Sequence, residues 1–157
     1  MVGTSSCQPI FDIGGGQTLV LRNAYSGEYL SAVSNSTLQQ ISSSPNDSRL
    51  WFTYDTNTLQ IQSLHNGLCI NDLWHGYSPN NSTSDTLAFS GCTNIFFEQF
   101  VYQPDTGYLL NPNNAYDKCI DGYPGYGPAI FLWQCTSGAT NLQWTITLVC
   151  PPGSVTS

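Results

Sequence analysis

Short apolar segments alternate with turn residues along most of the chain. The clearest ones in the first third are Thr18–Arg22, Tyr29–Val33, Leu38–Ile41, Trp51–Tyr54 and Leu59–Gln62. Gly, Ser, Asn, Asp and Pro separate them. A strand signal every roughly eight to twelve residues is typical of an all-β sandwich or barrel. No segment keeps a helical period for longer than about two turns, so the pattern predicts an all-β domain.

The same pattern occurs three times. Two segments, Gly67–Asn71 and Asp117–Asp121, share a Cys-Ile-Asn/Asp core, and each is followed by a second cysteine and then by an aromatic residue. These followers are Cys92 and Phe100 in one copy and Cys135 and Trp144 in the other. The first copy has no cysteines, but Glu28–Ala32 takes the place of the first cysteine segment and Arg49–Tyr54 the place of the aromatic segment.

Three repeats of about 40–50 residues are each too short to fold alone. We place them at about 17–58, 59–108 and 109–149, with tails on either side, in one domain covering 1–157. Such units close their cores against one another, which favours a closed barrel with pseudo-threefold symmetry and no exposed sheet edges. One aromatic per repeat would then lie in the core: Trp51, Phe100 and Trp144.

The six cysteines allow fifteen pairings. The repeat pattern favours Cys69–Cys92 and Cys119–Cys135 inside single repeats, and Cys7–Cys150 between the two ends of the domain. No CxxC or Cys/His spacing predicts a metal site, and no cofactor is expected.

Charge narrows the list of partners. The net charge is −7, and Arg22, Arg49 and Lys118 are the only basic residues. Nucleic acids and anionic membranes need clustered Lys or Arg, so both are excluded as partners, and no segment is long and apolar enough to enter a bilayer as a span. Glycosylation acceptor patterns at Asn35, Asn46, Asn80 and Asn81 join the cysteines in favouring a secreted, extracellular glycoprotein.

The repeat motifs resemble those of a known family. The strongest are Cys119–Asp121, Ile130–Cys135 and Asn141–Trp144, with weaker echoes at Leu68–Asn71 and Glu98–Phe100. They resemble the ricin B-chain-like (R-type) lectins and carbohydrate-binding modules, which are disulfide-stapled β-trefoils. The resemblance covers about 17–149 and implies a shallow sugar site in each repeat.

The third repeat matches best. The resemblance implies that Asp121 accepts hydrogen bonds from sugar hydroxyls, that Trp133 stacks on the apolar face of the sugar, and that Asn141 adds a hydrogen bond. The chemistry suits this task, because a carboxylate can accept from two hydroxyls and an indole offers a large apolar surface at low entropic cost. Two family glutamines are missing, with Phe131 and Leu142 in their places.

Other interpretations of these residues stay open: Asp121 and Asn141 could be turn residues, and Trp133 could be a core residue. Tyr123 and Tyr126, in the loop 122–128, are further stacking candidates or loop packing.

The other two repeats are poorer. The second has Asn71 in place of the acid and Ser90 in place of the aromatic, and the first has Ser31 and Ala32 near the acid position.

No catalytic set is visible, and we expect no enzyme. His65 and His75 lie in loop-like contexts, and two positioned carboxylates, as glycoside hydrolysis requires, cannot be identified from sequence.

Three function classes remain. The first is a lectin or carbohydrate-binding module, for galactose or N-acetylgalactosamine as the family resemblance implies, with glycans or glycoproteins as partners. The second is a β-trefoil protease inhibitor that uses the long loop 74–86, and the third is a self-assembling structural domain with decayed sugar sites. A fused or associated catalytic domain and a homo-oligomer stay open.

Overall fold

The computed structural model describes residues 17–34, 37–72, 85–113 and 117–149. These contain twelve β-strands, and their helices are 3₁₀ turns of three residues. The elements fall into three sets of four strands, each with a 3₁₀ turn before its last strand. The first set is β1 (Leu19–Asn23), β2 (Tyr29–Ala32), β3 (Leu38–Ile41), η1 (Ser48–Leu50) and β4 (Phe52–Tyr54). The second is β5 (Ile61–Ser63), β6 (Cys69–Asp72), β7 (Asp85–Ser90), η2 (Phe96–Glu98) and β8 (Val101–Gln103). The third is β9 (Tyr108–Asn111), β10 (Lys118–Asp121), η3 (Pro124–Tyr126), β11 (Phe131–Gln134), η4 (Thr140–Leu142) and β12 (Trp144–Leu148).

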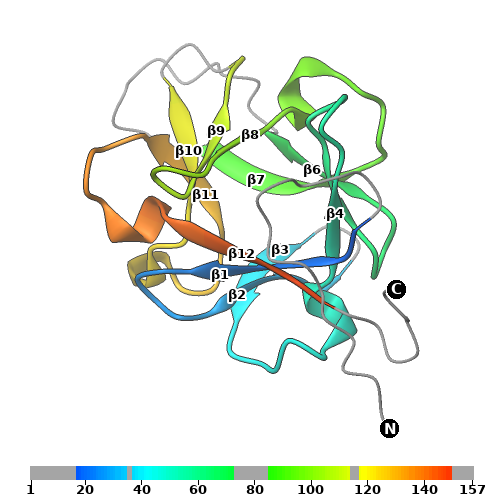
Figure 1. Ribbon diagram of the computed structural model, residues 1–157, viewed down its shortest axis with the longest axis horizontal. Coiled ribbons are helices and arrows are strands. Elements are labelled where there is room, and N and C mark those ends of the chain that lie inside the picture. The colour runs from blue at the N-terminus through cyan, green and yellow to red at the C-terminus, as the bar shows by residue number, and fades with distance from the viewer. Residues whose placement is uncertain (1–16, 35–36, 73–84, 114–116, 150–157) are drawn as a thin grey trace, which may run out of the picture.

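Six strands form a ring. β1 pairs with both β12 and β4, β4 pairs with β5, and β8 pairs with β9, all antiparallel. The backbone bonds Phe100 N–Leu59 O (2.8 Å) and Trp144 N–Gly107 O (2.8 Å) join the remaining neighbours. The hairpins β2–β3, β6–β7 and β10–β11 leave this ring and meet one another through β7–β11 and the Gln39–Ala129 bridge. Figure 1 shows the three groups of strands around a common centre. The fold is the expected β-trefoil.

The core draws on all three sets. Its largest fully buried aromatics are Phe52, Phe100 and Trp144, and each directly follows the residue that caps the C-terminal end of a 3₁₀ turn. The prediction of Trp51 as the core aromatic of the first repeat is wrong. Trp51 caps η1, is only half-buried, and donates from Nε1 to Pro45 O (2.9 Å). Because side chains alternate along a strand, the inward position falls on Phe52, one residue later.

Two predicted disulfides are present, Cys69–Cys92 and Cys119–Cys135. Each staples one hairpin to the loop that follows it. Cys7 and Cys150 lie outside the described residues, as do Asn35, Asn80 and Asn81. The fourth glycosylation candidate, Asn46, is exposed. Within the described ranges no helix has the length and apolar character that a bilayer span requires.

Candidate carbohydrate site

The β10–β11 hairpin puts the main candidates on one face. Its register places Asp121 opposite Phe131 and Cys119 opposite Trp133. Successive strand residues point to opposite faces, so these four side chains share the outer face while Ile120 enters the core. Directly paired side chains lie within about 5.5 Å and diagonal ones within about 8 Å. Asp121 and Trp133 are therefore diagonal neighbours.

Asp121 is a buried carboxylate with few partners. It is 3% exposed, and its Oδ1 accepts from Asn141 Nδ2 (2.8 Å) and from the Tyr123 backbone N–H (2.8 Å). Among the described residues, none donates a hydrogen bond to Oδ2. Burial raises the pKa of Asp121, and the two hydrogen bonds partly oppose that rise. A buried carboxylate can accept several hydrogen bonds, so this group has capacity left for a hydroxyl donor.

Asn141 is held at both ends. Its side chain donates to Asp121, and its backbone oxygen accepts from Gly122 N (3.0 Å) and from Asn23 Nδ2 (2.8 Å). Asn141 lies in η4, the turn before β12. The contacts fix the amide against the carboxylate, and the structure thus brings together two of the predicted residues.

Residues of the first repeat support this arrangement, and sequence reasoning missed them. Asn23 and Gln40 are buried, and Gln40 Nε2 donates to Gly122 O (2.8 Å). A Cβ at Gly122 would lie 2.6 Å from Asn23 Nδ2, so only glycine fits between these side chains and the loop after β10. The sequence signal was weak: Asn23 looks like an ordinary turn residue, and its partners lie far away along the chain.

Trp133 is half-buried: it lies outside the main core but is not fully exposed to solvent. It packs against a small second cluster formed by Tyr108, Cys119 and Leu142. The Cys119–Cys135 disulfide belongs to the same cluster. Packing on this cluster therefore fixes one side of the indole, and the rest of its surface is exposed to solvent.

Tyr123, one of the two tyrosine candidates, is exposed and lies near a second tyrosine ring. Tyr123 is 42% exposed, and its ring lies 6.1 Å, centroid to centroid, from that of Tyr25, which is 56% exposed. Tyr25 was not among the predicted site residues. Tyr126 belongs to η3, but its side chain lies outside the described part of the structure.

The second repeat has a polar network where the third has an aromatic. Asn71 Nδ2 donates to Ser90 Oγ (2.9 Å), which donates to Glu98 Oε1 (3.1 Å). Glu98 is fully buried and also accepts from the side chain of Gln60 and from the backbone and hydroxyl groups that follow Cys92. Among the described residues, Ser90 stands opposite Cys69, where Trp133 stands opposite Cys119 in the third repeat.

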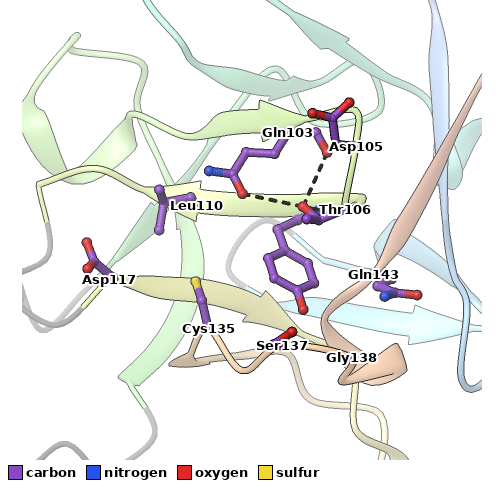
Figure 2. A pocket seen from close by; sticks show the side chains of 10 residues that line it. Gln103, Asp105, Thr106, Leu110, Asp117, Cys135, Ser137, Gly138 and Gln143 are labelled. Carbon is purple, nitrogen blue, oxygen red and sulfur yellow. Dashed lines mark hydrogen bonds between the residues drawn. The ribbon is translucent and has the colours of Figure 1, made fainter.

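A groove of about 610 Å³ lies elsewhere on the third repeat, between the β8–β9 turn and the loop after β11 (Figure 2). Its lining includes the exposed carboxylates of Asp105 and Asp117 and the side chains of Thr106, Leu110 and Cys135. None of the predicted sugar-binding residues lines it. Asp117, which lines the groove, precedes β10, whereas Asp121 ends that strand.

Among the described residues, no group of three or more His, Cys, Asp or Glu side chains is placed to hold a metal ion. His65 is exposed on the turn after β5, and His75 lies outside the described residues.

No family model matches the sequence, and no curated protein matches it. Solved structures do. One is a non-toxic homologue of type II RIPs from Momordica charantia in complex with α-methyl-D-galactoside, with a TM-score of 0.66 and 19% identity over 82% of this chain and 47% of that one. The agglutinin from Abrus precatorius has a TM-score of 0.64 and 15% identity over 86% of this chain and 48% of that one. An endo-β-galactosidase from Clostridium perfringens that releases GlcNAcα1-4Gal has a TM-score of 0.66 and 15% identity over 85% of this chain and 33% of that one.

These likenesses show the fold: the chain has the β-trefoil architecture of ricin B-like lectins. The chain spans less than half the length of these solved chains. Both lectins and enzymes are among the proteins that contain this fold.

Proposed function

We propose that this protein binds carbohydrate through Asp121, Trp133 and Asn141. The observation that carries the proposal is the Asp121 carboxylate, which is buried, held by Asn141 and not hydrogen-bonded at Oδ2 by any described residue. A sugar hydroxyl supplies the donor that Oδ2 lacks. The partly exposed indole of Trp133, on the same hairpin face, covers the apolar face of the sugar ring.

The sugar class is galactose or N-acetylgalactosamine. The family resemblance of the third-repeat motifs supports it, and one protein of the same fold was solved with α-methyl-D-galactoside. The disulfides and the lectin-like fold support an extracellular protein whose partners are glycans or glycoproteins. The protein acts in this proposal as a binding module and not as an enzyme.

A glycan array with three proteins tests the proposal: wild type, Asp121→Asn and Asp105→Asn. Asp121→Asn keeps an Oδ1 acceptor for Asn141 and Tyr123 but replaces the Oδ2 acceptor by an N–H donor. Asp105→Asn removes an equal charge from the groove of Figure 2, away from the site.

We expect galactosides to bind wild type and Asp105→Asn, and Asp121→Asn to lose at least about tenfold in affinity, as loss of a hydrogen bond to a charged group predicts. Loss on Asp105→Asn alone would move the site to the groove. Absence of any glycan binding to wild type would refute the proposed function.

A further inference from the structure

Two exposed aromatic rings stand beside the Asp121 site. Tyr25 comes from the β1–β2 turn and Tyr123 from the loop after β10, yet their ring centroids lie 6.1 Å apart with an interplanar angle of 47°. Pairs at this distance and tilt are attractive. Both residues nevertheless remain about half exposed to water (56% and 42%). This surface is apolar on its faces and polar at its hydroxyls, as a sugar-binding platform requires.

The network that holds Asp121 and Asn141 also holds the two tyrosines. Asn23 Oδ1 accepts from the Tyr25 backbone N–H (3.0 Å), while Asn23 Nδ2 donates to the backbone oxygen of Asn141 (2.8 Å). Asp121 Oδ1 accepts from the Tyr123 N–H (2.8 Å). Each tyrosine is therefore fixed at its backbone by a buried polar side chain that also contacts Asn141.

The Tyr123 ring has a defined position as well. It lies so close to Gly125 that a Cβ built there would stand 2.3 Å from Tyr123 Cε1. Glycine at this position lets the ring lie against the loop on one side and Tyr25 on the other. A preorganised aromatic pair loses little conformational entropy when a ligand arrives.

We propose that Tyr25 and Tyr123 form a second subsite, which binds the sugar residue next to the one held by Asp121. The ligand class is then an oligosaccharide that crosses from the third repeat to the first, and a free monosaccharide fills only part of the site. This inference rests on the proposed function.

Isothermal titration tests it with methyl α-galactoside and a panel of galactose-terminated disaccharides of different linkage. The proteins are wild type, Tyr25→Ala, Tyr123→Ala and, as an exposed-aromatic control on η2 in the second repeat, Phe96→Ala. Wild type should bind the best disaccharide about tenfold more tightly than the monosaccharide, the gain expected from one stacked ring. Tyr25→Ala should remove that gain and leave monosaccharide affinity unchanged, and Phe96→Ala should change neither affinity.

Three results would overturn the inference. Either no disaccharide binds more tightly than the monosaccharide, or Tyr25→Ala leaves the gain intact, or Tyr25→Ala weakens both ligands equally. In all three cases monosaccharide binding to wild type persists and the proposed function stands. If wild type binds neither ligand, the proposed function fails and the inference fails with it.

Discussion

Gly107 and Gly67 make a matched test of how the strands of the ring are joined. Each ends a turn in which its own N–H donates to a backbone oxygen four residues earlier, Gln103 O (2.8 Å) and Ser63 O (2.9 Å). Both have left-handed backbone, with φ of 78° and 75°. They differ in their surroundings, because a Cβ at Gly107 would lie 3.2 Å from Trp144 O, whereas nothing lies within 4 Å of one at Gly67.

Alanine at either position adds a backbone cost of about 1 kcal/mol, since a side chain disfavours positive φ. At Gly107 the Cβ also presses on the backbone of Trp144, whose N–H donates to Gly107 O (2.8 Å). Weakening that hydrogen bond costs about 1 kcal/mol more. We therefore expect Gly67→Ala to lower the free energy of unfolding by about 1 kcal/mol and Gly107→Ala by about 2 kcal/mol.

Urea unfolding followed by tryptophan fluorescence, with the disulfides intact, measures both values. In a thermal scan the two variants should lose about 3 °C and about 6 °C, by the usual scaling for a domain of this size. Equal losses, or a larger loss for Gly67→Ala, would refute the reasoning that the contact with Trp144 matters.

Three further predictions concern the site and its supports. Asp121→Asn should unfold at the same or a higher temperature than wild type at pH 7, because burial raises the pKa of Asp121 and its ionised form therefore destabilises the folded state as pH rises through that pKa. Thermal scans should show this advantage vanish at pH values below both the folded and the unfolded pKa. Wild-type sugar affinity, followed by titration, should fall as the carboxylate becomes protonated, at a pH above the usual 3.8. Replacing Cys119 and Cys135 by serine should cost about 3 kcal/mol in urea unfolding and also weaken sugar binding, since Trp133 rests on that cluster, whereas the same change at Cys69 and Cys92 should cost stability alone. Glu98→Gln should cost about 3 kcal/mol in the same unfolding assay without changing affinity, because an amide N–H would face donors that now meet a carboxylate oxygen; an unchanged midpoint would contradict this.

Local patterns were enough for much of the fold. Strand signals, the repeated cysteine segments and the turn residues predicted an all-β chain of three units, and the strand at 38–41 begins and ends as expected. The error at Trp51 also has a local cause. Two aromatics adjoin, and the residue that turns inward depends on where η1 ends, which the sequence does not state.

The sequence marked residues of the candidate site but not the residues that support them. The third-repeat motif marked Asp121, Trp133 and Asn141, and the structure shows Asp121 bonded to Asn141 and diagonal to Trp133 on the outer hairpin face. Asn23 and Gln40 could not be found this way, since their contacts with Asn141 and Gly122 join residues 118 and 82 positions apart. Contacts of that span depend on how the repeats pack together, and no local pattern records them.

The long-range bonds from Asn23 and Gln40 have a consequence for protein engineering. A peptide cut from the third repeat would contain Asp121, Trp133, Asn141 and the Cys119–Cys135 disulfide. It would lack the side-chain amides of Asn23 and Gln40, which now hold Asn141 and the loop at Gly122. Grafting that peptide onto an unrelated scaffold would transfer the side chains of the proposed site without the contacts that hold them in place. A transplant that kept these contacts would have to include Asn23, at the end of β1, and Gln40, on β3, so the smallest portable unit spans two repeats.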